Sequence, residues 1–152
     1  MKVFVFDEQS DLSIDPDSVQ PIVSQVLVKE KYSTDEVSVH FVTTKMIVEL
    51  HKKFFRDPSP TDCISFPIDQ HQFLGSHVLG EIFICPRTGI EYILKKNSKD
   101  QNYYHEITLY LVHGLLHLIG YNDIGEHDRA KMRKAEQKLM TFLIRNQILL
   151  KG

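Results

Sequence analysis

The sequence predicts one α+β domain in which a small mixed β-sheet of about four strands packs with about five helices. Three observations support this prediction. The chain has 152 residues, of which 42% are hydrophobic and 25% charged, as in one globular domain with a buried core. Short apolar runs alternate with longer segments of helical periodicity. No repeat or linker divides the chain, so residues 1–152 are treated as a single domain.

Four short apolar runs are predicted as strands. They cover residues 3–6, 36–42, 63–66 and 78–85, and turn-forming or charged residues bound them. Because helical segments separate several of these runs, part of the sheet should be parallel, with right-handed crossovers. Residues 69–77 are polar and contain Gly75, which favours a loop or turn.

Five segments show helical character. The first begins at Asp15-Pro16, an N-cap followed by proline, and runs to about residue 32. Thr43 or Thr44 caps the second, which ends before Pro58. The others cover residues 86–96, about 101–119 and about 126–150. For the fourth, the predicted cap is Ser98 or Asp100, and Gly120 ends the helix.

Composition excludes several classes of protein. Eighteen Lys and Arg against 20 Asp and Glu exclude a general polycation. The two cysteines, Cys63 and Cys85, form neither a disulfide framework nor a CxxC site, which favours reduced thiols in the cytoplasm. No stretch approaches the roughly 20 apolar residues of a membrane helix. Asp7 comes too early for a signal peptide, so we expect neither membrane association nor secretion.

The candidate chemistry lies around His113 and His117. Histidines at i and i+4 stand on one helix face, so both imidazoles can bind one metal ion. Gly120 then turns the chain, and Asp123 follows His117 at the spacing of the third ligand in the zincin-like pattern H-E-x-x-H-x-x-G-x-x-H. Three protein ligands would leave a position for water on one Zn²⁺ per chain. His127 is an alternative or additional ligand.

Two departures from that pattern matter. Gly114 replaces the glutamate that serves metallopeptidases as a base, and Asp123 replaces the third histidine. The first argues against peptide hydrolysis by the usual route, while a carboxylate is a legitimate zinc ligand. A histidine pair on an apolar helix can also be a pair of core residues with satisfied nitrogens.

Three blocks of the sequence resemble the YbeY endoribonuclease family. Residues 113–121 follow its H-G-x-L-H-L-x-G-Y-D-H signature, with Asn122 and Asp123 in place of its last two residues. Residues 60–67 resemble its P-T-D-V-L-S-F-P block, and residues 79–82 its L-G-D-I block, in the family's order. The resemblance implies a single-strand-specific, metal-dependent endoribonuclease acting in small-subunit 3′-end maturation and in ribosome quality control. It also implies single-stranded and ribosomal RNA, with the small ribosomal subunit, as partners, and no DNA.

The resemblance also implies a functional arginine before the P-T-D block. Its position falls on Phe55, with Arg56 one residue later, so Arg56 is the candidate to bind a phosphate and the charge of the transition state. An ordinary exposed arginine is the alternative. Glu81 is predicted to orient a ligand histidine, or else to face water at a strand end, and Tyr121 to lie near the cleft.

Charge is unevenly distributed along the chain. Residues 1–40 carry three lysines against eight acidic residues, whereas residues 127–152 carry seven basic against two acidic residues. If the last helix packs near the metal, its cations can attract an RNA backbone. The alternative is a solvated amphipathic face. Two further functions stay open: a zincin-like peptidase, and a non-catalytic ribosome-maturation module with a decayed or structural metal site.

Overall fold

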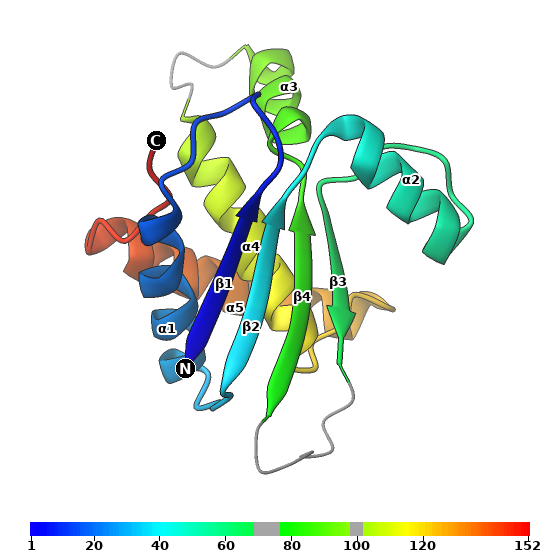
Figure 1. Cartoon of the computed structure of the whole chain (residues 1–152). Helices are drawn as coiled ribbons and strands as arrows, with labels where there is room; N and C mark the ends of the chain where they lie inside the picture. The colour runs from blue at the N-terminus through cyan, green and yellow to red at the C-terminus, as the bar shows by residue number, and fades with distance from the viewer. Residues whose placement is uncertain (69–76, 98–101) are drawn as a thin grey trace.

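The computed structural model describes residues 1–68, 77–97 and 102–152, so the loop predicted over residues 69–77 lies almost wholly outside the described residues. Within these ranges ten elements follow one another: β1 (Lys2–Asp7), a 3₁₀ turn η1 (Pro16–Ser18), α1 (Val19–Lys29), β2 (Glu36–Phe41), α2 (Thr44–Phe55), β3 (Cys63–Pro67), β4 (Val78–Ile84), α3 (Pro86–Lys96), α4 (Tyr103–Leu118) and α5 (Glu126–Arg145). The α+β fold of four strands and five α-helices confirms the prediction (Figure 1).

The strands form one mixed sheet in the order β1-β2-β4-β3. β1 pairs with β2 and β2 with β4 in parallel, while the edge strand β3 runs antiparallel to β4. The predicted partly parallel sheet is therefore confirmed. The parallel arrangement follows from the connections, because α1 links β1 to β2 as a crossover helix.

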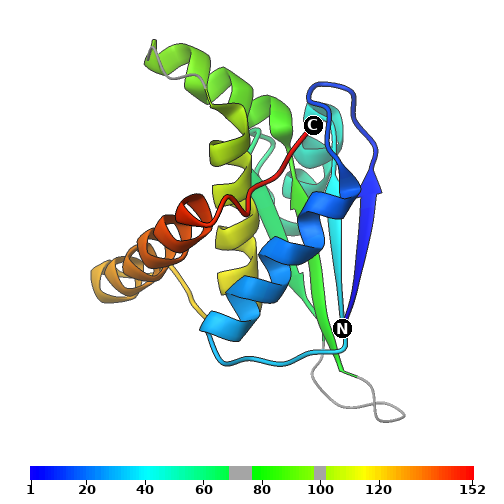
Figure 2. The ribbon, with the colours of Figure 1, turned by 90° about the vertical axis from the view of Figure 1, so that its left-hand side faces the viewer.

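Helices α1, α4 and α5 lie on one side of the sheet (Figure 2). α4 is apolar on nearly all sides, and its buried residues include Leu111, Leu115 and Leu118. A helix of that kind belongs in the interior. It packs on β3 and β4, while α1, α3 and α5 contact it from outside. The core around α4 therefore fixes the position of the two histidines that the helix carries.

Several helix ends differ from the prediction. Asn102 caps α4, because its side-chain oxygen accepts a hydrogen bond from the His105 backbone amide. The predicted caps, Ser98 and Asp100, lie outside the described residues. The first helix begins as a 3₁₀ turn and its α-helical part ends at Lys29, and α5 ends at Arg145.

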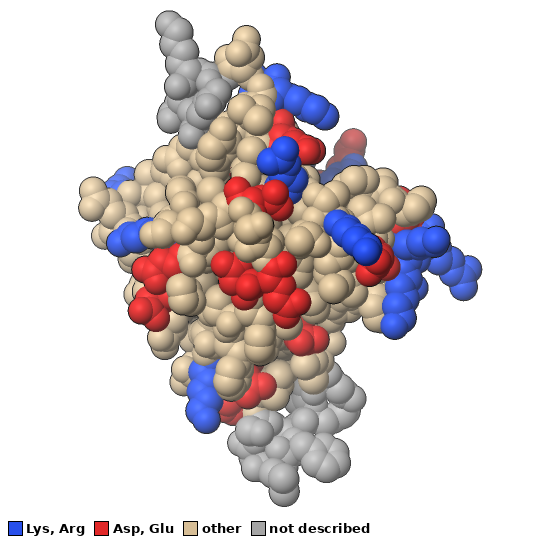
Figure 3. All heavy atoms as spheres, turned by 45° about the horizontal axis from the view of Figure 1, so that its top comes forward, with Lys and Arg blue, Asp and Glu red and all other residues tan. Residues whose placement is uncertain are grey.

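Charge is segregated over the molecule. Figure 3 brings forward the end of the sheet at which β1, β2 and β4 finish; acidic side chains gather in the middle of this face and basic ones lie toward its edges. This face is therefore unsuited to an RNA backbone. No helix in the described part of the chain has both the length and the apolar character needed to cross a membrane.

Candidate metal centre

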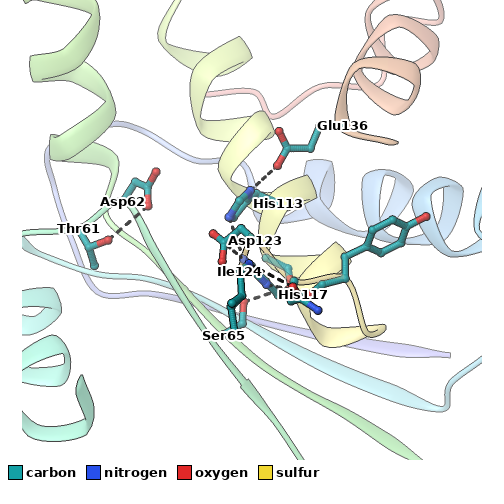
Figure 4. Close-up of polar contacts among 11 residues, drawn as sticks. Thr61, Asp62, Ser65, His113, His117, Asp123, Ile124 and Glu136 are labelled. Carbon is teal, nitrogen blue, oxygen red and sulfur yellow. Dashed lines mark hydrogen bonds and ion pairs between the residues drawn. The ribbon is translucent and has the colours of Figure 1, made fainter. Parts of the chain in front are cut away.

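Three side chains from α4 and the loop after it converge at one point (Figure 4). His113 and His117 lie one turn apart on α4, and their Nε2 atoms are 3.0 Å apart. An oxygen of Asp123 lies 3.8 Å from His117 Nε2. One ligand atom from each residue lies within 4.8 Å of the others, and in the described ranges this is the group of His, Cys, Asp and Glu side chains that could hold a metal ion.

The loop that carries Asp123 is shaped by the end of α4. Gly120 adopts a φ of 114°, which L side chains rarely adopt, and its amide donates to the His117 carbonyl. The Tyr121 amide donates to the carbonyl of Leu116, so the last turn of the helix is closed. The chain can then reverse and bring Asp123 back beside the histidines, as the spacing predicts.

Both imidazole rings are oriented through their Nδ1 atoms. His113 Nδ1 hydrogen-bonds a carboxylate oxygen of Glu136 from α5, and His117 Nδ1 hydrogen-bonds the Tyr121 carbonyl oxygen at 3.1 Å. Because both partners are acceptors, each Nδ1 carries the proton. The two Nε2 atoms then face each other with lone pairs.

The 3.0 Å between the two Nε2 atoms is also a hydrogen-bond distance, so either a proton on one imidazole or a metal ion can occupy the space between them. Two ligand atoms that are each about 2.0–2.1 Å from a tetrahedral zinc ion lie about 3.3 Å apart, close to the separation seen here. Two imidazole nitrogens and one carboxylate oxygen also form a donor set that zinc accepts. The residues present therefore fit a divalent metal ion.

The pKa values of the two histidines shift in opposite directions. Burial lowers the pKa of His113, but the hydrogen bond and the charge of Glu136 outweigh burial, and the pKa is raised overall. Burial and the neighbouring His113 lower the pKa of His117. Glu136 therefore makes His113 the more basic of the two imidazoles.

The donors open into a cavity of about 450 Å³ between α4, β3 and the end of α2. No lysine or arginine is among the described residues that line it. Asp62 and Cys63 line it as well, but burial, aided by the charge of Asp62, raises the pKa of the Cys63 thiol. Cys63 therefore stays protonated and is poorly suited to act as nucleophile or ligand.

Gly114 explains why the metallopeptidase glutamate is missing. A Cβ at this position would lie 2.7 Å from Ile82 Cγ2 and 3.0 Å from Cys63 Sγ. The Ser65 hydroxyl donates to the Gly114 carbonyl at 3.1 Å, which fastens the helix to β3. Position 114 therefore faces the sheet, where a glutamate side chain has no room.

Other predicted residues lie elsewhere. Arg56 is exposed and forms the left-handed C-cap of α2. Phe55 lines the cavity and Arg56 does not, so the catalytic role of Arg56 stays a prediction. Glu81 contacts His40 at 3.2 Å, and its role in orienting a ligand histidine stays a prediction. His127 is exposed and does not belong to the group that could hold a metal ion.

The sequence reasoning missed Glu136, and its signal is weak. Glu136 lies on α5 between the buried positions Met132 and Leu139, where one polar residue beside an apolar stripe is unremarkable. Only the packing of α5 against α4 reveals what it contacts. Tyr121 does lie beside the centre, through its backbone carbonyl; its hydroxyl points away and donates to Glu30.

Comparison with known proteins adds independent information. A family model described as Endoribonuclease YbeY matches residues 4–144. The Endoribonuclease YbeY of Protochlamydia amoebophila is 46% identical over 145 residues, 95% of this chain and 95% of that protein. That of Chlamydia trachomatis serovar D is 41% identical over 151 residues, 99% and 92% of the two chains. The solution structure of TM1509 from Thermotoga maritima has a similar fold, with a TM-score of 0.61 at 22% identity over 91% of this chain and 87% of that one.

Proposed function

The chain belongs to the endoribonuclease YbeY family, and on this premise we propose that it is a zinc-dependent endoribonuclease that cuts single-stranded RNA during ribosomal RNA maturation. The observation that carries the proposal is the convergence of His113, His117 and Asp123 on one point. Processing at the 3′ end of small-subunit RNA and ribosome quality control, in the cytoplasm and with the small subunit as partner, are the roles we assign to it.

The protein residues divide the work at this centre. His113, His117 and Asp123 would hold the ion, which when bound supplies Lewis-acid activation of water and neutralises charge developing on a phosphodiester. Glu136 and the Tyr121 carbonyl hold the two imidazoles in the tautomer that leaves Nε2 free. The adjoining cavity of about 450 Å³ is where we place an unpaired nucleotide.

The two alternative functions have less support. A zincin-like peptidase needs a base at position 114, and this position is packed against Ile82. A non-catalytic module with a decayed or structural metal site is not favoured by the relatives, which are named as endoribonucleases.

The test is cleavage of a labelled single-stranded RNA by the purified protein. We expect cleavage with Zn²⁺, loss of cleavage with a chelator, and its return when Zn²⁺ is restored. His117→Ala and Asp123→Ala should lose cleavage by at least about a hundredfold, because a ligand is removed. His127→Ala, a substitution of an exposed histidine outside the metal-binding group, should keep it.

Circular dichroism must show that each variant is folded. Cleavage that persists unchanged in chelator would remove the metal from the mechanism. If His127→Ala loses cleavage while Asp123→Ala retains it, the third ligand is His127 and not Asp123.

A further inference from the structure

A basic groove lies next to the metal centre, between the end of α1 and the outer side of α5. Its volume is about 770 Å³. Five of its lining residues are cations: Lys29, Lys131, Lys134, Lys138 and Arg145. Glu30 is its acidic lining residue, and its carboxylate accepts a hydrogen bond from the Tyr121 hydroxyl at 3.0 Å. The groove therefore carries a strong excess of positive charge in a chain whose net charge is −2.

The groove follows from how α5 distributes its residues. One side of the helix carries the buried residues Met132, Leu139 and Leu143, which pack into the core. Glu136, next to this stripe, contacts His113. Lys134 and Lys138, at i and i+4, lie on a different side, the one that lines the groove. One helix thus supports the metal centre with one face and presents cations with another.

Tyr121 connects the groove to the metal centre. Its carbonyl holds the His117 ring, and its side chain lines the groove. A smaller hollow, lined by residues 119–122 with Asp128 and Lys131, shares Tyr121 and Lys131 with the groove. The surface is therefore continuous from the loop that carries Asp123 to the lysines of α5.

The approach to the metal centre beside His113 is acidic. There a cavity of about 520 Å³ is lined by Asp62, Glu106 and Glu136 together with His113. Burial raises the pKa of the half-buried Glu106 carboxyl group. A polyanion that leaves the metal centre in this direction meets carboxylates, whereas one that crosses the Tyr121 loop meets lysines.

The groove also contains aromatic rings. Lys29 Nζ lies 4.0 Å from the centre of the Phe142 ring, and Lys131 Nζ lies 5.7 Å from that of Tyr121. Cations that follow a backbone, together with rings on which bases can stack, are the combination that binds single-stranded nucleic acid without sequence preference.

We infer that the α1–α5 groove binds the RNA strand that continues beyond the metal centre, with its lysines on the phosphates. This inference rests on the proposed function for its substrate, and it adds where the strand runs and which residues hold it. From Lys131 to Arg145 the helix extends about 21 Å, enough for several nucleotides.

The test uses the full chain with Lys134→Gln and Lys138→Gln combined. Both side chains are exposed and neither contacts a metal ligand, so the variant should fold and hold metal normally. The control combines Lys45→Gln and Lys95→Gln, two exposed lysines outside the groove whose removal changes net charge equally. The probe is a labelled single-stranded RNA of roughly 16 nucleotides, within the range that such sites accept, in chelator so that it stays intact.

We expect fluorescence anisotropy to show binding weakened by about tenfold in the groove variant, with the control unchanged. The slope of log affinity against log salt should fall by about 1.4, since each lost phosphate contact on a single strand contributes about 0.7. Equal affinity and equal slope in the groove and control variants would overturn the inference, and would leave the groove to a partner of another class.

Kinetics separate this inference from the proposed function. With Zn²⁺, KM for the long RNA should rise in the groove variant, while cleavage of an RNA of roughly four nucleotides should match wild type. RNA binding that depends on Lys134 and Lys138 in a protein that cuts no RNA would support the groove and overturn the nuclease. If both variants cut RNA and the KM for each RNA is the same in the groove variant as in the control variant, the nuclease would be supported and the groove overturned.

Discussion

Hydrogen bonds at Nδ1 decide what His113 and His117 can do. With both Nδ1 protons donated, to Glu136 and to the Tyr121 carbonyl, both Nε2 lone pairs are free to bind a cation. The charge of Glu136 would also make His113 a stronger donor to a metal ion. Glu136 thus has the position of the acceptor that the sequence analysis assigned to Glu81. The third donor, Asp123, is exposed, so it adds negative charge to the site but does not shield the site from solvent.

Removing the charge of Glu136 should weaken metal binding. Glu136→Gln should lower zinc affinity about tenfold to a hundredfold, because the amide no longer stabilises the donor ring of His113. Competition with a chromophoric chelator measures the affinity. Glu126→Gln, with the same charge change at an exposed position of α5, is the control. Equal affinity in the two variants would mean that Glu136 does not tune the site.

Helix α4 holds the centre because it lies directly against the sheet. Gly114 allows this close approach, and the Ser65 hydroxyl locks it by a hydrogen bond to the Gly114 carbonyl. The same contact excludes the side chain that a peptidase would need. One residue without a Cβ thus shapes both the packing and the chemistry.

Gly114→Ala should destabilise the protein by about 1–2 kcal/mol. The added methyl must displace Ile82 or Cys63, which costs about 1–3 kcal/mol, and the better helix propensity of alanine returns up to about 1 kcal/mol. Urea unfolding of the metal-free protein measures the change. Glu49→Ala, exposed on α2, should change little. A variant as stable as wild type would contradict this prediction, because it would mean that Ile82 and Cys63 can move aside without loss of stability.

A bound ion would join helix α4 to the loop that follows it. Its ligands lie on α4 and on the following loop, and Glu136 extends the connection to α5. Binding to the folded state alone raises the free energy of unfolding. Metal binding should therefore be visible as thermal stability of the whole chain.

Chelation should lower the melting temperature. With zinc at about 100 times its Kd, binding contributes about 2.7 kcal/mol, which corresponds to roughly 5–10 °C for a chain of this size. Differential scanning calorimetry with and without chelator measures the shift. His113→Ala should melt at one temperature under both conditions. An equal shift in this variant would place the responsible ion elsewhere.

The sequence by itself determined the class of fold, the parallel part of the sheet, the histidine helix with its glycine turn, and the family. These features depend on local patterns: periodicity, caps, and ligand spacing along one helix and the turn after it. The choice between Asp123 and His127 was open in the sequence, and the structure brings Asp123 to the histidines.

Only the tertiary structure decided which acidic residue contacts the histidine pair, why position 114 is glycine, and where the cations of α5 lie. Each of these depends on contacts between elements distant in the sequence: Glu136 with His113, Gly114 with Ile82, and α1 beside α5. The physical reason is that a side chain's neighbours across a packing interface depend on how two helices, or a helix and a sheet, are oriented. Periodicity along a single element carries no information about that orientation.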